Sequence, residues 1–98
     1  MFSNGLSLAE AERLALLVEE CGEVQQIIGK VLRHGYESRW PLDGKTNRER
    51  LEDELGDLFL IYELFCNAKD LNPYNVLLRK QTKVKKLKKW VHHQEGVI

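Results

Sequence analysis

Two short acidic patterns contain the residues of this chain that are best suited to chemistry. Residues 19–23 read Glu-Glu-Cys-Gly-Glu, and residues 54–57 read Glu-Leu-Gly-Asp. In each pattern two carboxylates stand three positions apart, so a helix would place them on one side, about one turn from each other. The pairs are Glu20 with Glu23 and Glu54 with Asp57.

The helix sides that carry these pairs are otherwise apolar. The helical neighbours are Leu16, Leu17, Val24 and Ile27 around the first pair, and Leu51, Leu58, Leu60 and Ile61 around the second. No Lys or Arg stands three or four positions from Glu20 or Asp57. Burying such carboxylates without a cation costs several kcal/mol or forces them to bind protons. The pattern therefore predicts a cation among the four acids, and a divalent metal is the simplest candidate.

The ligand chemistry favours Mg²⁺ over a softer metal. Mg²⁺ prefers oxygen ligands and usually keeps waters and substrate phosphates, so two carboxylates from each of two facing helices would form an open oxygen site. Cys21 lies about 100° from Glu20 around the helix axis, and the histidines lie elsewhere in the chain, so we do not expect thiolate or imidazole ligands.

Glycines accompany both acidic pairs. Gly22 precedes Glu23, and Gly56 precedes Asp57. A glycine inside a helix costs about 1 kcal/mol relative to alanine. Its presence predicts either a close approach of the helices where the carboxylates converge or a plain packing contact.

Capping signals and apolar periodicity predict the helices that position these acids. Residues 7–10 form a capping box, and the helix that follows is expected to end near Arg33, before Gly35. Residues 46–49 form a second capping box, and the second helix should run to about Ala68. The intervening segment, with its proline, glycine and charges, is predicted to be a loop.

A third helix is predicted to start after Asn72, with Pro73 at its first position, and to fade by His93 or Gly96. Its composition differs from that of the rest of the chain. Residues 1–70 carry 8 Lys/Arg and 14 Asp/Glu, a net charge of −6, whereas residues 71–98 carry 7 and 1, a net charge of +6. The protein is therefore expected to have an acidic body and a basic C-terminal helix, at about residues 73–92.

The predicted fold is all-α, with residues 1–98 forming a single domain. The apolar stripes on the first two helices are wider than one face, and three helices cannot easily shield them. We therefore predict a helical hairpin plus a C-terminal helix, with a four-helix-bundle core completed by oligomerisation as a homodimer or homotetramer.

Several features argue for a soluble, cytoplasmic protein. The chain has only two cysteines, both inside apolar helical patterns, which favours a reducing compartment. No apolar run reaches the roughly 20 residues of a membrane span. Residues 1–5 lack the basic start and apolar stretch of a signal peptide.

These residues resemble the signature of the MazG-like all-α nucleoside triphosphate pyrophosphohydrolases, a group related to dimeric dUTPases and phosphoribosyl-ATP pyrophosphatases. The resemblance covers about residues 8–91 and rests on the two acidic patterns. Its other elements are Lys30, Arg33, His34, Gly35, Asn47 and Arg48, and together they look especially like short phage or bacterial members. One departure is the separation of Glu23 from Glu54, about thirty residues, which lies toward the long end of the family's range.

The resemblance implies a hydrolase that converts a nucleoside or deoxynucleoside triphosphate to the monophosphate and pyrophosphate. It implies that two or more Mg²⁺ ions, with Mn²⁺ as the alternative, are held by Glu20, Glu23, Glu54 and Asp57. Glu19, the extra acid of the first pattern, would be the catalytic group that orients or deprotonates the attacking water.

Basic and aromatic residues supply the candidate substrate contacts. Lys30 and Arg33 follow Glu23 on the same helix, where they either neutralise the triphosphate or form a solvated helix end. Lys83 and Lys86 of the third helix either contact the phosphates or belong to the solvated face of an ordinary amphipathic helix. The candidate base-stacking residues are Tyr36 and Trp40, which could instead cover the edge of the core.

Two other classes of function remain open from the sequence. The chain could be a non-catalytic, oligomeric helical interaction module. It could also be a small nucleic-acid-binding protein that uses its third helix, although the acidic body would repel a polyanion.

Overall fold

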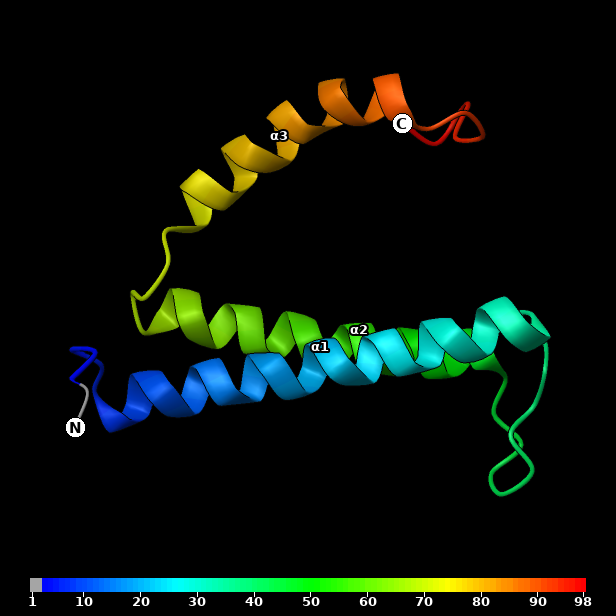
Figure 1. Cartoon of the computed structure of the whole chain (residues 1–98), viewed down its shortest axis with the longest axis horizontal. Helices are drawn as coiled ribbons and strands as arrows, with labels where there is room; N and C mark the ends of the chain where they lie inside the picture. Colours follow the sequence, from blue (N-terminus) through cyan, green and yellow to red (C-terminus); the bar gives the residue numbers. More distant parts are fainter. Residues whose placement is uncertain (1–2) are drawn as a thin grey trace.

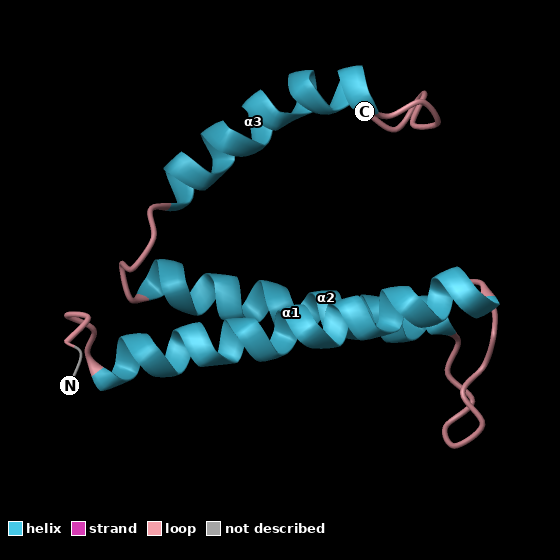
Figure 2. Cartoon of the chain, in the orientation of Figure 1, coloured by secondary structure: helices cyan, strands magenta, loops and turns pink. Residues whose placement is uncertain are grey.

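The computed structural model describes residues 3–98 and contains three α-helices (Figure 1). Helix α1 spans Leu8–His34, α2 spans Asn47–Asn67 and α3 spans Pro73–Trp90. No strand occurs in the described residues (Figure 2). Arg39 and Thr46 form an isolated antiparallel bridge in the α1–α2 loop. The all-α prediction is confirmed. The first two residues, part of the segment tested above for a signal peptide, lie outside the described residues.

Reciprocal capping boxes begin the first two helices, as predicted. Ser7 Oγ accepts from the Glu10 amide at 3.1 Å, while the Ser7 amide donates to Glu10 Oε1 at 2.8 Å. At the second start, the Glu49 amide donates to Thr46 Oγ1 and the Thr46 amide donates to Glu49 Oε1, both at 3.1 Å. These bonds satisfy amides that no helical carbonyl can reach.

Local signals also begin α3. Asn72 Oδ1 accepts from the Tyr74 amide at 2.9 Å, and Pro73 occupies the first turn. The helix ends at Trp90, because Val91 adopts an extended conformation with ψ 147°. The predicted end at His93 or Gly96 was therefore a few residues late.

Helices α1 and α2 lie side by side as an antiparallel hairpin (Figure 1). Its buried apolar core within one chain consists of Ile27 from α1 and Ile61 and Phe65 from α2. At the open end, Arg13 donates to Asp70 through Nε at 2.6 Å and Nη2 at 3.1 Å. This two-bond ion pair fastens the start of α1 to the segment that follows α2.

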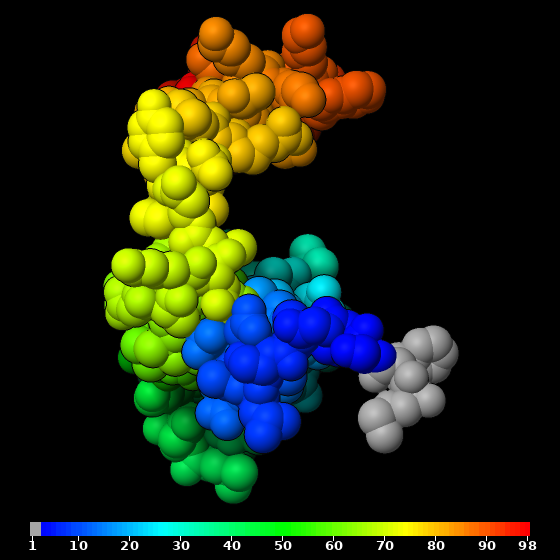
Figure 3. Space-filling model, turned by 90° about the vertical axis from the view of Figure 1, so that its left-hand side faces the viewer, coloured from blue at the N-terminus to red at the C-terminus, as the bar shows by residue number. Residues whose placement is uncertain are grey.

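Helix α3 stands away from the hairpin, joined to it by a narrow connection (Figure 3). None of its residues is buried, and its apolar side chains Val76, Leu77 and Leu78 are exposed. The hairpin also exposes large apolar side chains, among them Phe59 and Leu60. The hairpin plus C-terminal helix is confirmed, while completion of a four-helix core by a second copy stays a prediction.

No helix among residues 3–98 combines the length and the apolar character needed to cross a membrane.

Candidate metal centre

Four carboxylates from two helices converge in the seam between α1 and α2. One oxygen from each of Glu20, Glu23, Glu54 and Asp57 lies within 4.8 Å of the others. The two glutamates of α1 and Glu54 are half-buried, and Asp57 is exposed. The structure thus brings together the four residues that the sequence singled out, at an edge of the seam open to solvent.

Helical spacing explains why the acids reach this seam. Ile27 follows Glu23 by four positions, and Ile61 follows Asp57 by four positions. Residues four apart lie on the same helix face, and both isoleucines are buried between the helices. The packing that hides the isoleucines therefore turns each acid toward the opposite helix.

Burial and like charge make two of the four acids, Glu20 and Glu54, hold protons more strongly than free acids do. The pKa of Glu54 is raised to about 7, mainly by burial, then by the neighbouring Glu23 carboxylate and by the other nearby negative charges. The pKa of Glu20 is also raised, first by burial and then by the charges of Glu23 and Asp57. A bound cation would favour the ionised forms instead.

Two oxygen atoms in the cluster show that its donor set fits a metal. Glu20 Oε2 and Glu54 Oε2 are buried and have no hydrogen-bond partner among the described residues. An unpaired buried acceptor is unfavourable, and a hard divalent cation would satisfy both atoms. Because all four donors are carboxylate oxygens, the cluster suits Mg²⁺ or Mn²⁺ better than a metal that prefers sulfur or nitrogen.

Glu19 lies beside the cluster but is not one of its four members. Its side chain is exposed, and its negative charge contributes to the raised pKa of Glu20. An exposed carboxylate close to a metal site can accept a proton from water. Its catalytic role remains a prediction.

The predicted role of the two glycines is wrong within this chain. Apart from its chain neighbours and the adjacent backbone of its own helix, a Cβ added at Gly22 or at Gly56 would meet no described atom within 4 Å, and both residues are exposed. Each lies one position from an acid of the seam, and a single step turns a side chain by about 100° around the helix. The glycines consequently sit on outer sides of the hairpin, where no close approach or packing contact occurs.

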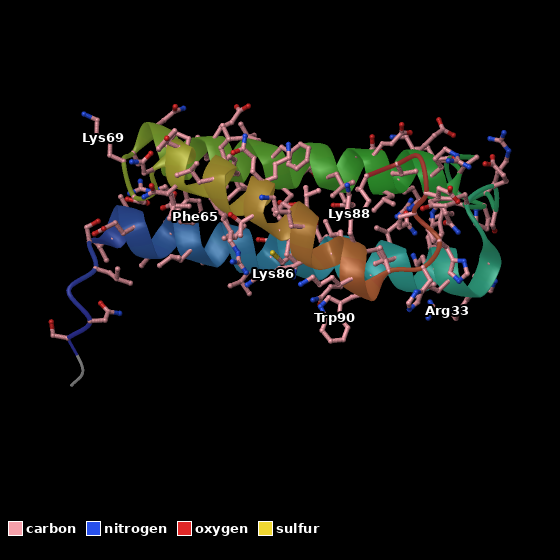
Figure 4. All side chains as sticks on the ribbon, turned by 90° about the horizontal axis from the view of Figure 1, so that it is seen from above. Arg33, Phe65, Lys69, Lys86, Lys88 and Trp90 are labelled. Atoms are coloured by element: carbon pink, nitrogen blue, oxygen red, sulfur yellow. The ribbon has the colours of Figure 1, made fainter. Side chains whose placement is uncertain are left out.

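The predicted cations of α1 have different surroundings. Lys30 is half-buried, with Nζ 4.2 Å from the centre of the Trp40 ring. Arg33 is exposed at the loop end of the hairpin (Figure 4). The sequence interpretation missed Arg50 of α2, whose guanidinium lies 4.8 Å from the same ring. Its signal was spacing, since Arg50 precedes Glu54 by four positions.

Lys83 and Lys86 do not join the carboxylates within one chain. Both are exposed on α3, which has no extensive contact with either helix of the hairpin. Figure 4 shows α3, with Lys86 labelled, crossing above the hairpin. Their assignment to substrate binding stays a prediction, and it requires α3 either to move or to serve another copy.

Comparison with known proteins identifies the family of this chain. Residues 9–92 match the family model of the MazG nucleotide pyrophosphohydrolase domain. Neither a curated protein nor a solved structure gives a significant match. The matched region contains both acidic pairs, the connecting loop and all of α3. Because the match covers well over half of its length, the chain belongs to the MazG nucleotide pyrophosphohydrolase domain family.

Proposed function

We propose that this protein is a Mg²⁺-dependent enzyme that hydrolyses a nucleoside or deoxynucleoside triphosphate to the monophosphate and pyrophosphate. The observation that carries the proposal is the convergence of four carboxylate oxygens within 4.8 Å at a solvent-open seam. The family supports nucleotide pyrophosphohydrolase activity in general. The metal, the products and the residue roles go beyond what the family match supports.

The carboxylates of the seam would form the metal centre. Four ionised acids carry enough negative charge to balance two divalent cations, so Glu20, Glu23, Glu54 and Asp57 would hold two or more Mg²⁺ ions, with Mn²⁺ as the alternative. Such ions, when bound, neutralise phosphate charge and make water more acidic. Half-burial keeps the glutamates in place before substrate arrives, which reduces the ordering cost of binding.

Glu19 would act on the attacking water. Its exposed carboxylate borders the cluster without joining it, so an oxygen remains available to accept a proton. A positioned general base typically contributes about 10²–10⁴-fold to a rate. Orienting the water for in-line attack would be part of the same role.

Side chains at the loop end would balance the rest of the phosphate charge. Lys30 and Arg33 are the residues we assign to this role, since both lie on α1 between the acids and the loop. Fixed cations of this kind stabilise negative charge as it moves toward the leaving group.

A second copy of the chain would cover the apolar surface that a single chain leaves exposed. The exposed apolar side chains of α3 and of the hairpin need a cover, and the −6 and +6 segments are complementary in charge. In a homodimer or homotetramer, Lys83 and Lys86 could then approach the acidic seam of a neighbouring copy. A reducing, cytoplasmic location belongs to the same proposal, because Cys21 and Cys66 are free thiols.

The decisive experiment is a panel of canonical and modified nucleoside triphosphates with Mg²⁺, assayed for both monophosphate and pyrophosphate. Glu20→Gln and Asp57→Asn should lower turnover by at least about a hundredfold, because each removes a charged ligand. Glu52→Gln, an exposed acid of α2 outside the cluster, is the matched control and should retain activity. Wild-type turnover rates in both seam variants would refute the proposal.

A further inference from the structure

The loop between α1 and α2 places one aromatic ring against two cations. Lys30 Nζ of α1 lies 4.2 Å from the centre of the Trp40 ring, and the Arg50 guanidinium of α2 lies 4.8 Å from it. Each distance is within the range of an attractive cation–π contact. Trp40 therefore connects the two helices through their positive side chains.

These cations lie in the same seam as the carboxylates. Lys30 follows Glu23 by seven positions, and Arg50 precedes Asp57 by seven positions. Seven residues are nearly two helical turns, which restores the same face. Because α1 and α2 run antiparallel, both steps lead toward the loop, about 10 Å along the seam at 1.5 Å per residue.

The loop holds Trp40 by its backbone. The Trp40 amide donates to the Lys45 carbonyl at 2.7 Å, and the Trp40 carbonyl accepts from the Gly44 amide at 2.9 Å. At the end of the loop, buried Asn47 donates from Nδ2 to the Gly35 carbonyl at 3.0 Å. Both backbone polar groups of Trp40 are therefore bonded within the loop, and the two cations lie against its ring.

Arg50 is held mainly by stacking and by one loose ion pair. Its Nε is buried without a hydrogen-bond partner among residues 3–98, and its Nη1 lies 3.6 Å from Asp43 Oδ2. The side chain as a whole is 27% exposed. A guanidinium has five N–H donors, so Arg50 retains capacity for an anion.

We propose that Trp40 is a positioning residue that presents Lys30 and Arg50 as a preorganised cation pair for the phosphate groups of the substrate. Preorganised side chains lose less entropy on binding, and arginine can bind phosphate through two parallel hydrogen bonds. The proposal rests on the proposed function and deepens it by adding Arg50 and Trp40 to the site. Base stacking by Trp40 is the competing role. A stacked base would have to share the Trp40 ring with the two cations that already lie against it.

The test compares substitutions at Trp40 on two ligands, only one of which has a base. Trp40→Leu should raise both the KM for a hydrolysed nucleotide and the inhibition constant of inorganic tripolyphosphate by about fivefold. Trp40→Phe keeps an aromatic ring and should recover most of the loss. Loss of nucleotide affinity alone would assign Trp40 to base stacking and overturn the proposal.

Tyr36→Leu is the matched control from the same loop. Tyr36 also lies under a cation, Arg48, at 4.5 Å. Arg48 precedes Asp57 by nine positions, which places it on the opposite side of α2 from the seam. The control should leave the inhibition constant of tripolyphosphate unchanged, because that ligand has no base for Tyr36 to stack on.

A double-mutant cycle separates positioning from a direct contact. If Trp40 acts through its neighbours, Trp40→Leu should weaken tripolyphosphate binding much less in a Lys30→Met, Arg50→Met background than in the wild type. Fully additive losses would overturn the proposal. Thermal melts identify any variant that folds poorly, in which case Trp40→Phe carries the comparison.

Tripolyphosphate binding also tests the proposal without turnover. In a Trp90→Phe protein Trp40 is the sole tryptophan, so tripolyphosphate with Mg²⁺ should change its fluorescence. An absence of this signal, together with unchanged inhibition constants, would refute the cation pair. Failure of the wild type to hydrolyse any nucleotide would instead refute the proposed function.

Discussion

The hairpin and α3 are both helical, yet they bury their side chains very differently. The hairpin encloses Ile27, Ile61 and Phe65, and its seam gathers four carboxylates. Helix α3 has an equally clear start but no buried residue. Capping and periodicity thus specify a helix locally, whereas burial depends on what the helix meets. The two helices of the hairpin pack against each other, and we infer that α3 packs against another copy of the chain.

The largest expected effect is a loss of self-association when a charge is placed on the apolar side of α3. Leu77 is 47% exposed in the single chain. If a second copy covers it, Leu77→Asp should weaken self-association at least about tenfold, because burying a leucine contributes about 1.5–3 kcal/mol. Analytical ultracentrifugation over a concentration series measures this change.

Gln81→Glu provides the control for that experiment, since it adds the same charge at an exposed polar position of α3. It should associate like the wild type. A wild-type chain that stays monomeric at all concentrations would remove the basis of the comparison, because α3 would then be uncovered in solution as well.

A smaller effect is expected from the carboxylates of the seam, which should make the melting temperature depend on pH. The pKa of Glu54 is raised from 4.5 to about 7, chiefly by burial. The folded state binds the Glu54 proton more tightly than the unfolded state does. The stabilisation of the folded state by this proton is therefore fully present below pH 4.5 and is lost as the pH rises to about 7. The melting temperature of the metal-free protein should therefore fall across this window, and Glu20 acts in the same direction.

Calorimetry with and without Mg²⁺ checks this expectation. Saturating Mg²⁺ should raise the melting temperature most at the high end of the window, where the carboxylates are ionised. Glu54→Gln should flatten the metal-free dependence. The pKa of Glu49 is lowered by its bonds to Thr46, so its titration falls below the window. An equal pH response in Glu54→Gln would contradict the assignment.

The sequence predicted the features of this molecule that depend on local spacing. Capping boxes act within four residues, so two helix starts were located correctly. The acidic pairs converged because each is one turn from a buried isoleucine. Arg50 was missed because its partner, Trp40, reaches it through the path of the loop. The glycines do not make the predicted contact within one chain, because the side of the hairpin that they occupy depends on how each helix is rotated about its axis.

The smallest expected effect concerns the ion pair at the open end of the hairpin. Arg13 and Asp70 form two hydrogen bonds with side chains only 21% and 16% exposed, whereas Arg48 and Glu37 pair at 54% and 74% exposure. Arg13→Met should lower the melting temperature by a few degrees, since a well-ordered two-bond pair resists solvent screening better than an exposed one. Arg48→Met should have almost no effect.

Because Asp70 lies between α2 and α3, hydrogen exchange in Arg13→Met should rise at the start of α1 and at the end of α2, while the buried seam near Ile27 stays protected. Equal melting temperatures for the two variants would show that the open end of the hairpin is held by its apolar contacts alone.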